Sequence, residues 1–402
     1  MASTEIAVIG GGIVGGSIAW QLASRGAGNV TLYEKSVIAA GASGRTGALL
    51  RRHYTNEPEA RLAQLGWNTY RDWEDVVGGS CGFVAWPVIV TVATKGDYGS
   101  NVDLMRTNIA MQNRLGIDSQ LITADELQRL QPHAYVGDVD YVSFEPDSGY
   151  VDSIQATTSM VNAARNAGAK IREGVEVTTV HQSGGRVKGI STSDGDAPAD
   201  IVICAAGPWS TAILGTVGIE VPISTIRVQI IIAQRPIELI EPHYIYLDTA
   251  AGIFTRPWGP GRSLVGVAGG DQHDAVDPNT TDLFNDHTYP AKAIEAISHR
   301  IPAMKSARYL HGHAGLYDMT PDAHPIIGNV GLDGLYLAAG FSGAGFKKGP
   351  AVGITLAEMI IDGKARSADL APFSLDRFVS DAWKEPWSAT EYRYDSDFGH
   401  GL

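Results

Sequence analysis

The sequence predicts an α/β fold in which a Rossmann-like domain is interleaved with a second, α+β domain built on a mixed sheet. An apolar run, a glycine-rich turn and a small-residue helix pattern follow one another over residues 5–24. Strand patterns that fit the same parallel sheet return at 170–207 and 335–339, and the blocks between these pieces are richer in long strands. Short apolar strands that alternate with helical patterns are typical of a parallel sheet covered by helices.

The N-terminal segment carries the pattern of a dinucleotide site. The apolar run 6–9 ends in Gly10, which permits a tight turn, and Gly12 lets the backbone approach a pyrophosphate. Gly15 lets the following helix pack closely on the sheet. Phosphates bind at such a helix N-terminus, because free N–H groups and the positive end of the helix dipole converge there.

An acidic residue completes this pattern at about the expected spacing of 20 residues. Residues 30–33 predict the next parallel strand, and Glu34 follows at its C-terminal end. A carboxylate at this place accepts hydrogen bonds from the ribose of an adenosine. Strand, turn, helix and acid together predict a bound dinucleotide cofactor.

Length and composition exclude several classes of protein. A chain of 402 residues exceeds the size at which a single core keeps growing, so we expect two domains. The net charge of −13 offers no basic surface to nucleic acid or to anionic lipid. The absence of a leader pattern and of an apolar stretch of membrane-spanning length predicts a soluble, cytoplasmic protein without membrane or nucleic-acid partners.

The cysteines and histidines do not predict a metal site or a disulfide. Cys81 and Cys204 are far apart in the sequence, and we expect both to be buried thiols. The eleven histidines show no metal-ligand spacing. His311 and His313 are close together, but we expect them to lie on one face of a strand.

The order of the patterns predicts that the cofactor-binding domain is discontinuous. A helix is expected over 155–167, and strands over 170–172, 175–180, 187–190 and 200–207. A last strand over 335–339, a glycine-rich loop over 340–346 and a helix over 347–360 complete the domain. We assign residues 1–85, 145–221 and 314–402 to this domain, and 86–144 and 222–313 to a substrate-binding domain.

Five motifs carry a resemblance to a known family. They are GGGIVG with Glu34 and Lys35, the loop 41–47, the segment AAGPW at 205–209, the segment 320–328, and the closing GFSGAGFKKGPAVG. With them the chain resembles the D-amino-acid oxidase superfamily of FAD-dependent oxidoreductases, and within it the sarcosine oxidase, glycine oxidase and amino-acid dehydrogenase group. The resemblance implies a GR2-type FAD-binding domain, and oxidation of a C–N bond to an imine that hydrolyses.

The resemblance also implies which residues contact FAD. The loop 42–49 would let the backbone reach the pyrophosphate and the isoalloxazine ring, and the alternative is a plain surface turn. The positions that match the family's FAD contacts are Gly10, Gly12, Ile13, Val14, Gly15, Glu34, Lys35, Ala42, Ser43, Arg45, Thr46, Gly47, Ala48, Leu49, Val177, Ala206, Gly207, Trp209, Gly343, Ala344, Gly345, Phe346 and Lys347.

Two cationic residues match the positions that hold the substrate carboxylate in sarcosine oxidases. They are Arg51, after the loop, and Lys347, at the start of the last helix. A guanidinium forms a paired contact with a carboxylate, and an ammonium adds a point charge. Arg52 stays an alternative to Arg51 after a slip of one residue, whereas the motif fixes Lys347 rather than Lys348. The same helix N-terminus would stabilise negative charge on reduced flavin.

Several aromatic residues are candidates for the wall of the substrate site. They are Tyr54, Tyr244, Tyr246, Phe254, Trp258 and Tyr317. The resemblance favours Tyr246 and Tyr317 as catalytic-site residues, and ordinary core packing remains the alternative for each. We expect Arg256 to pair within the sheet rather than to meet a second carboxylate.

The chain departs from its resembling group at several positions. The cysteine or early histidine that anchors flavin in some sarcosine oxidases is missing around 315–318 and Arg45, so we expect noncovalent FAD. The glycine oxidases have an arginine about where Tyr317 stands, which disfavours glycine as the substrate. An apolar residue near the strand 263–266 replaces the oxygen-activating lysine of sarcosine oxidases, which argues against fast reaction with oxygen.

These observations lead to one leading hypothesis and two alternatives. The leading hypothesis is an FAD enzyme that oxidises an amino acid or N-alkyl amino acid by hydride transfer to flavin N5, with oxygen or an electron carrier as the acceptor. The first alternative is a 2-hydroxy-acid dehydrogenase of the same superfamily. The second is the FAD subunit of a hetero-oligomeric dehydrogenase. A homo-oligomeric state is left open.

Overall fold

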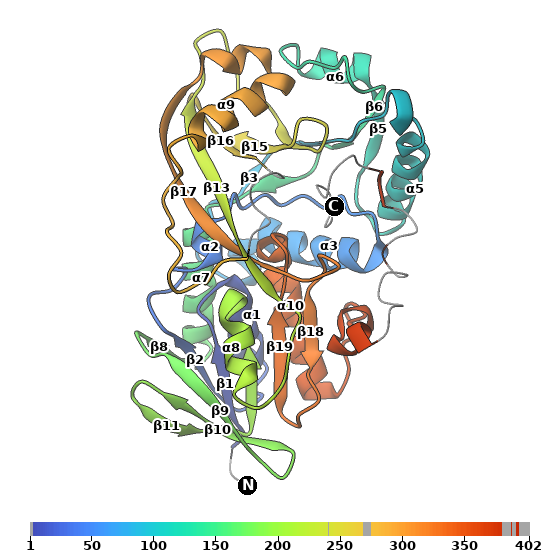
Figure 1. Cartoon of the computed structure of the whole chain (residues 1–402). Coiled ribbons are helices and arrows are strands. Elements are labelled where there is room, and N and C mark those ends of the chain that lie inside the picture. The colour runs from blue at the N-terminus through green and yellow to red at the C-terminus, as the bar shows by residue number, and fades with distance from the viewer. Residues whose placement is uncertain (1–2, 240, 268–274, 380–386, 388–390, 394–402) are drawn as a thin grey trace.

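A computed structural model describes residues 3–239, 241–267, 275–379, 387 and 391–393 (Figure 1). Its first large sheet has six strands. Their order is β18 (Ile326–Asn329), β19 (Leu335–Ala339), β12 (Ile201–Cys204), β1 (Glu5–Ile9), β2 (Asn29–Glu34) and β8 (Lys170–Glu173). All neighbours are parallel except β18 and β19, which are antiparallel. The sheet therefore brings together strands from both ends and the middle of the chain.

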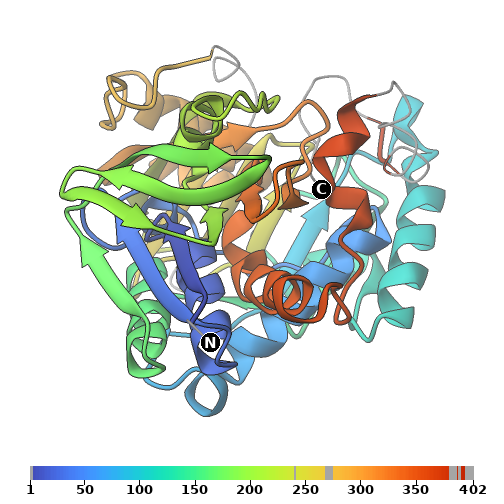
Figure 2. The same ribbon diagram turned by 90° about the horizontal axis from the view of Figure 1, so that it is seen from below.

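The six-stranded sheet is buried on both faces, because β1 alternates between two cores. Ile6 and Val8 join the core formed with α1 (Ile13–Ser24), α7 (Ser153–Asn166) and α10 (Gly345–Asp362). Ala7 and Ile9 join the core on the other face, as period-two alternation requires. That face is covered by α8 (Ser210–Gly215) and by a sheet of β9 (Val177–Ser183), β10 (Arg186–Thr192) and β11 (Gly195–Pro198). Figure 2 shows this small green sheet and α7 on opposite sides of the blue strands β1 and β2.

The second large sheet has eight strands. Their order is β17 (Arg308–Met319), β13 (Ser224–Gln234), β16 (Arg262–Val267), β15 (Ile253–Pro257), β14 (Ile245–Asp248), β4 (Val88–Thr91), β6 (Tyr141–Glu145) and β5 (Gln120–Thr123). The pairing is antiparallel except between β14 and β4. Helix α9 (Tyr289–Arg300) packs on one face of this sheet. The opposite face points toward the C-terminal ends of β1 and β2 (Figure 1).

The remaining elements connect the two sheets. They are α2 (Ala42–Arg45), α3 (Glu57–Arg71), α4 (Trp73–Val76), β3 (Val84–Ala85), α5 (Asn101–Arg114), α6 (Ala124–Leu130), β7 (Gly149–Tyr150), and short 3₁₀ turns at Gly96–Tyr98, Gly207–Trp209, Pro302–Ser306, Ala371–Phe373 and Leu375–Val379. Helix α3 crosses α10 closely at Gly66, where a Cβ atom would lie 2.1 Å from the carbonyl oxygen of Lys347. Glycine is required at this crossing because no side chain fits.

The observed architecture confirms the predicted α/β fold class with a Rossmann-like unit and a mixed sheet. The predicted helices at 155–167 and 347–360 correspond to α7 and α10, and the predicted strands correspond to β8, β9, β10, β12 and β19 within a few residues. The division into two domains stays a proposal, because β6 and β17 run across the boundaries placed at 144 and 313.

Three further expectations concern the cysteines, the histidines and the membrane. Cys81 and Cys204 are both buried free thiols. His311 and His313 are two residues apart on β17, so they lie on the same face of the strand. The described residues contain no cluster of His, Cys, Asp and Glu that could hold a metal ion. None of the helices in the described ranges is both long and apolar enough to cross a membrane.

Candidate active site

An elongated cavity of about 440 Å³ lies between the two large sheets. One end is formed by the β1–α1 turn and the C-terminal end of β2, where parallel strands usually bind ligands. The other end is formed by the face of the eight-stranded sheet, through Val228, Ile230 and Phe254, and by the N-terminus of α10. The cavity therefore has a polar, glycine-rich end and an apolar end.

The β1–α1 turn is shaped by its glycines. Gly10 has φ +113°, and a Cβ atom there would lie 2.3 Å from the carbonyl oxygen of Ala205. Gly12 is the N-cap of α1 and has no side chain that could separate the helix N-terminus from the cavity. Ser43 Oγ accepts the amide of Ile13 at 3.0 Å, which joins the α2 loop to the same helix end.

Glu34 is held in place by backbone amides. Its two carboxylate oxygens accept the N–H groups of Gly11 and Ser36, each at 2.8 Å. These bonds fix the orientation of the carboxylate at the edge of the cavity and leave acceptor capacity for a ribose.

A second group of side chains flanks this polar end. Lys35 Nζ lies 3.8 Å from the centre of the Trp209 ring, and both residues line the cavity. The indole N–H of Trp209 donates to Asn279 Oδ1 at 2.7 Å. Asn279 comes from the segment that precedes α9, so the two halves of the chain meet at this end of the cavity.

The cavity fits a flavin dinucleotide. A bare helix N-terminus suits a pyrophosphate, and an oriented carboxylate suits an adenosine ribose. The apolar end is broad enough to be lined by Phe254, Tyr317 and Phe346 together, as a planar isoalloxazine ring requires. The first turn of α10 begins at Gly345 beside this end, without an acidic residue that would oppose negative charge there.

Most of the predicted cofactor residues line the cavity. Those that line it are Gly10, Gly12, Ile13, Val14, Glu34, Lys35, Ala42, Ser43, Arg45, Thr46, Gly47, Val177, Ala206, Gly207, Trp209, Gly343, Gly345 and Phe346. Five others are not part of the lining: Gly15, Ala48, Leu49, Ala344 and Lys347. Gly15 serves packing, since a Cβ atom there would meet the carbonyl of Gly10 at 2.0 Å.

Several residues of the cavity wall were not predicted from the sequence. Val228, Ile230 and His313 belong to one face of the eight-stranded sheet, and Asp318 belongs to the end of β17. Burial raises the pKa of Asp318 to about 6, and its carboxylate accepts the amide of Gly340 at 2.6 Å. Apolar alternation along β13 was the available signal for Val228 and Ile230, but it does not tell which of the two faces meets a cavity.

Arg51 lies in the buried connection between the α2 loop and α3. Its guanidinium donates to the backbone carbonyl of His53 and lies 4.1 Å from the centre of the Tyr54 ring. The residue is 8% exposed. It is therefore held in one position, four residues after Gly47, which lines the cavity.

Lys347 lies on the first turn of α10, directly after two residues that line the cavity. It is 8% exposed, and among the described residues no carboxylate forms an ion pair with it. Burial, followed by the charges of Arg51 and Lys348, lowers the pKa of Lys347 well below its usual range. The charge of Glu59 acts in the opposite direction, but Glu59 forms its described ion pair with Lys348. We therefore expect an anion beside Lys347 to be stabilised.

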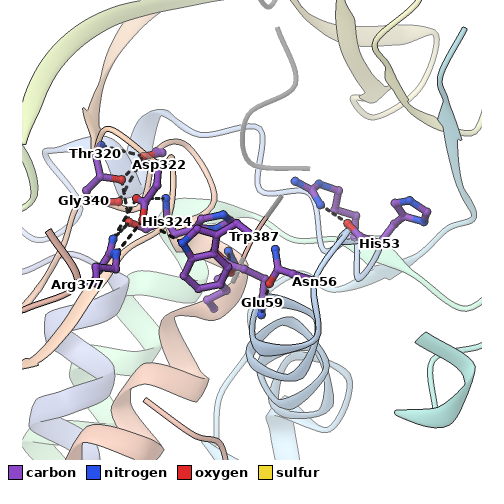
Figure 3. A network of polar contacts seen from close by, with 12 residues as sticks. His53, Asn56, Glu59, Thr320, Asp322, His324, Gly340, Arg377 and Trp387 are labelled. Atoms are coloured by element: carbon purple, nitrogen blue, oxygen red, sulfur yellow. Dashed lines mark hydrogen bonds and ion pairs between the residues drawn. The ribbon is translucent and has the colours of Figure 1, made fainter. Parts of the chain in front are cut away.

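The neighbouring Lys348 is tied to a structural network instead. It is fully buried, forms an ion pair with Glu59, and lies 4.3 Å from the centre of the Tyr54 ring. Asn56 caps α3 and accepts the amide of Glu59, which sets Glu59 on the first turn. The second carboxylate oxygen accepts from His324 Nδ1 at 2.9 Å. Figure 3 shows Asn56 and Glu59 on α3, with His324 nearby.

Arg52 is likewise used for structure. Its guanidinium lies 4.0 Å from the centre of the Trp67 ring and donates to Gln64 and to the carbonyl of Asp147. Its backbone amide donates to Glu145 at 3.0 Å. Arg52 is therefore held by structural partners, which favours Arg51 as the ligand-binding residue of the two.

The two predicted tyrosines have different positions. Tyr317 lines the cavity, where its ring touches the backbone of Gly343 so closely that a Cβ atom would lie 2.4 Å away. Burial raises its pKa to about 12, so it stays a neutral hydrogen-bonding group. Tyr246 does not line the cavity: it is fully buried in the core under α9, on the sheet face opposite the cavity. Its partner Thr255 faces the same way, whereas Phe254, one residue earlier, faces the cavity.

Arg256 behaves as expected for a residue paired within the protein. Its guanidinium lies between the rings of Tyr150 and Trp258, at 4.3 and 4.4 Å from their centres. It donates to the carbonyls of Gly47 and Pro257. Arg256 therefore supports the loop that lines the cavity at Gly47.

The chain is similar to known flavin-dependent enzymes over most of its length. The sequence profile of the family "FAD dependent oxidoreductase" (DAO) matches residues 5–359. The chain is 28% identical over 366 residues to 4-methylaminobutanoate oxidase (formaldehyde-forming) of Paenarthrobacter nicotinovorans, which covers 89% of the chain but 43% of that protein. It is 25% identical over 384 residues to sarcosine oxidase subunit beta of an Arthrobacter species, covering 94% of the chain and 91% of that subunit.

A solved structure agrees with these relatives. The crystal structure of L-proline dehydrogenase from P. horikoshii has a TM-score of 0.84 and 29% sequence identity, and the match covers 94% of this chain and 98% of that one. The family profile spans the whole cavity, from the β1–α1 turn to α10. The chain therefore belongs to the DAO family of FAD-dependent oxidoreductases.

Proposed function

We propose that this protein oxidises the C–N bond of an amino acid whose nitrogen carries an alkyl substituent. FAD is the cofactor of its family, as the sequence predicts. The single observation that carries the proposal is the buried Lys347, a cation without a described counter-ion next to Arg51 and the apolar end of the cavity. We call Arg51 and Lys347 the carboxylate clamp.

The names of relatives support the choice of substrate class. A 4-methylaminobutanoate oxidase, two sarcosine-oxidising proteins and an L-proline dehydrogenase act on substrates with a substituted nitrogen and a carboxylate. Because this chain spans 43% of the first of these relatives, its activity is inferred from the site and not from that name.

The chain's own residues would bind and orient this substrate. The Arg51 guanidinium can form two parallel hydrogen bonds to the carboxylate, and Lys347 adds a point charge. The two cations also disfavour a charged substrate amine, so the amine binds in its neutral form with a free electron pair. Phe254 and Tyr317 exclude water from the same end of the cavity.

The reaction then needs little further chemistry from the protein. When bound, FAD supplies the two-electron oxidation by accepting a hydride from the substrate carbon next to nitrogen. As that C–H bond breaks, the nitrogen electron pair completes a C=N bond, and later addition of water yields a carbonyl compound and an amine. The first turn of α10, close to the apolar end, favours negative charge there because of its dipole.

The test is anaerobic mixing of the purified yellow protein with matched compounds, followed by air. The panel contains N-methyl amino acids, cyclic secondary amino acids, primary amino acids, their methyl esters, and 2-hydroxy acids. We expect bleaching at 450 nm by secondary amino acids and much weaker bleaching by the methyl esters. Bleaching by hydroxy acids alone, or by none of the compounds, would refute the proposal.

A second candidate is the FAD subunit of a hetero-oligomeric enzyme. It is favoured by the similarity to proteins named sarcosine oxidase subunit beta, of which the chain covers 88–91%. In that case the amino acid bleaches the flavin, but neither air nor a soluble dye restores the colour at a rate that supports turnover. Prompt recovery in air identifies a self-sufficient oxidase.

A further inference from the structure

Two aromatic residues close to the C-terminus, Trp387 and Tyr392, contact residues that hold the carboxylate clamp in place. Tyr392 contacts His53, which follows Arg51 by two residues. Trp387 contacts His324, and His324 is hydrogen-bonded to Glu59, the ion-pair partner of Lys348. Both aromatic side chains are buried. They belong to a part of the chain that no cofactor motif includes.

Gln112 and Tyr392 contact the two ring nitrogens of His53. Gln112 donates its amide to the carbonyl of Tyr54 at 2.9 Å, so its nitrogen also faces His53 Nδ1, at 3.2 Å. His53 Nδ1 therefore accepts, and its Nε2 carries the proton that is donated to the Tyr392 hydroxyl at 2.7 Å. Burial and the charge of Arg51 lower the pKa of His53 to about 3, so this arrangement persists at neutral pH.

His53 in turn holds Arg51. The backbone carbonyl of His53 accepts from the Arg51 guanidinium, and the His53 and Tyr392 rings stack with their centres 5.9 Å apart and 10° between their planes. Tyr392 is itself anchored in an apolar cluster with Val88 and Ile245 under the eight-stranded sheet. The position of Tyr392 thus determines where the His53 carbonyl, and with it the guanidinium, can lie.

Trp387 acts on the other half of the clamp. Its ring centre lies 3.8 Å from that of His324, and its indole N–H donates to Asp322 at 3.1 Å. Asp322 is held by a two-pronged contact with Arg377 at 2.7 and 3.0 Å. Figure 3 shows Trp387 beside His324, between the Asp322–Arg377 pair and Glu59.

This chain of contacts reaches Lys347 through its neighbour. His324 donates to Glu59, and Glu59 forms the ion pair with Lys348, the next residue on α10. Burial alone would raise the pKa of Glu59, but the charge of Lys348 and the His324 hydrogen bond lower it to about 2. Glu59 is therefore a carboxylate at neutral pH, and its ion pair with Lys348 fixes the rotation of the first turn of α10, from which Lys347 extends.

We propose that Trp387 and Tyr392 are positioning residues for the carboxylate clamp, one for each of its two cations. The inference rests on the proposed function, because it concerns the same site. Neither residue needs to touch the substrate. A displacement of about 1 Å in a binding group can lower the rate up to about a hundredfold. Contacts that keep Arg51 and Lys347 in place should therefore affect both substrate binding and the rate.

The experiment compares Tyr392→Phe and Trp387→Phe with the wild-type holoenzyme. Tyr392→Phe keeps the stacked ring and removes only the hydroxyl that accepts from His53. We expect the Kd of acetate, read from the perturbed flavin spectrum, to rise about tenfold in each variant. We also expect kcat/KM for the amino acid to fall by a similar factor, while kcat/KM for its methyl ester and the FAD content stay unchanged.

The matched control is Tyr309→Phe. Tyr309 lies at the start of β17, and its hydroxyl contacts Asn285, far from the clamp in the fold. This variant should bind acetate like the wild type. Equal losses on acid and ester, or no loss in either variant, would overturn the inference, because a merely structural role affects both substrates alike.

The same measurements separate this inference from the proposed function. A wild-type flavin that no amino acid reduces overturns the proposed function, and the inference is then judged on the acetate Kd of the variants. A wild-type protein that does not bind acetate at all overturns both.

Discussion

Replacing Lys347 by methionine should weaken carboxylate binding without destabilising the protein. The two side chains have similar length, so the change removes the charge and keeps most of the packing. A hydrogen bond to a charged group contributes about 1.5–3 kcal/mol, which corresponds to a rise of about 10- to 150-fold in the Kd of a carboxylate ligand. Because Arg51 remains, binding should be weakened rather than abolished.

Removal of Lys347 should not lower the free energy of unfolding, in contrast to removal of a buried cation that is ion-paired. In the folded protein the pKa of Lys347 is lowered by burial and by Arg51 and Lys348. Below its unfolded pKa, the unfolded chain binds a proton more readily than the folded one, so the lysine destabilises the fold at neutral pH. Lys347→Met removes this effect, and its free energy of unfolding should equal or exceed that of the wild type at pH 7.

Lys348→Met is the matched comparison on the same helix. Lys348 forms a buried ion pair with Glu59, and removal of one partner leaves an uncompensated carboxylate. Such a loss costs about 3–5 kcal/mol. Thermal unfolding and acetate titration of the holoenzyme check both variants. If Lys347→Met is as unstable as Lys348→Met, or if its acetate Kd changes less than twofold, the assigned roles of the two lysines are wrong.

Three further predictions concern the cofactor and the buried network. Gly10→Ala should strongly reduce the FAD bound per chain, measured as the 450 to 280 nm absorbance ratio, because its Cβ would lie 2.3 Å from the Ala205 carbonyl oxygen. FAD should be noncovalent, so acid precipitation should leave the yellow colour in the supernatant. Because the pKa of Glu59 is lowered to about 2, its charge stabilises the fold above its unfolded pKa and loses this effect as pH falls toward 2. The stability deficit of Glu59→Gln should therefore be largest at neutral pH and shrink in denaturant titrations at pH 3.

The cofactor end of the site could be predicted from the sequence because its contacts are local. Gly10, Gly12 and Glu34 belong to one βαβ unit, in which a fixed spacing fixes geometry. The same holds for the loop 41–47 and for Gly343 and Phe346, which lie close to strand ends. For these residues a motif already contains most of the structural information.

The substrate end could not be predicted in the same way, because it depends on strand register. Tyr246 and Phe254 both looked like wall residues, but Tyr246 pairs with Thr255 and Phe254 pairs with Leu247. A shift of one residue moves a side chain to the other face of a sheet, so Tyr246 joins the core and Phe254 joins the cavity. No pattern within either strand distinguishes these outcomes.

In each of the adjacent cationic pairs, 51–52 and 347–348, the two residues have different roles in the fold. Neighbouring residues point in different directions, about 100° apart on a helix and to opposite sides of an extended chain. In each pair the second residue is turned toward structural partners: Arg52 toward Trp67 and Gln64, and Lys348 toward Glu59. The first residue of each pair, Arg51 or Lys347, is close in the sequence to residues that line the cavity. A chain with a net charge of −13 therefore keeps a locally positive site, and its selectivity for anionic substrates should follow from Arg51 and Lys347 rather than from the charge of the whole molecule.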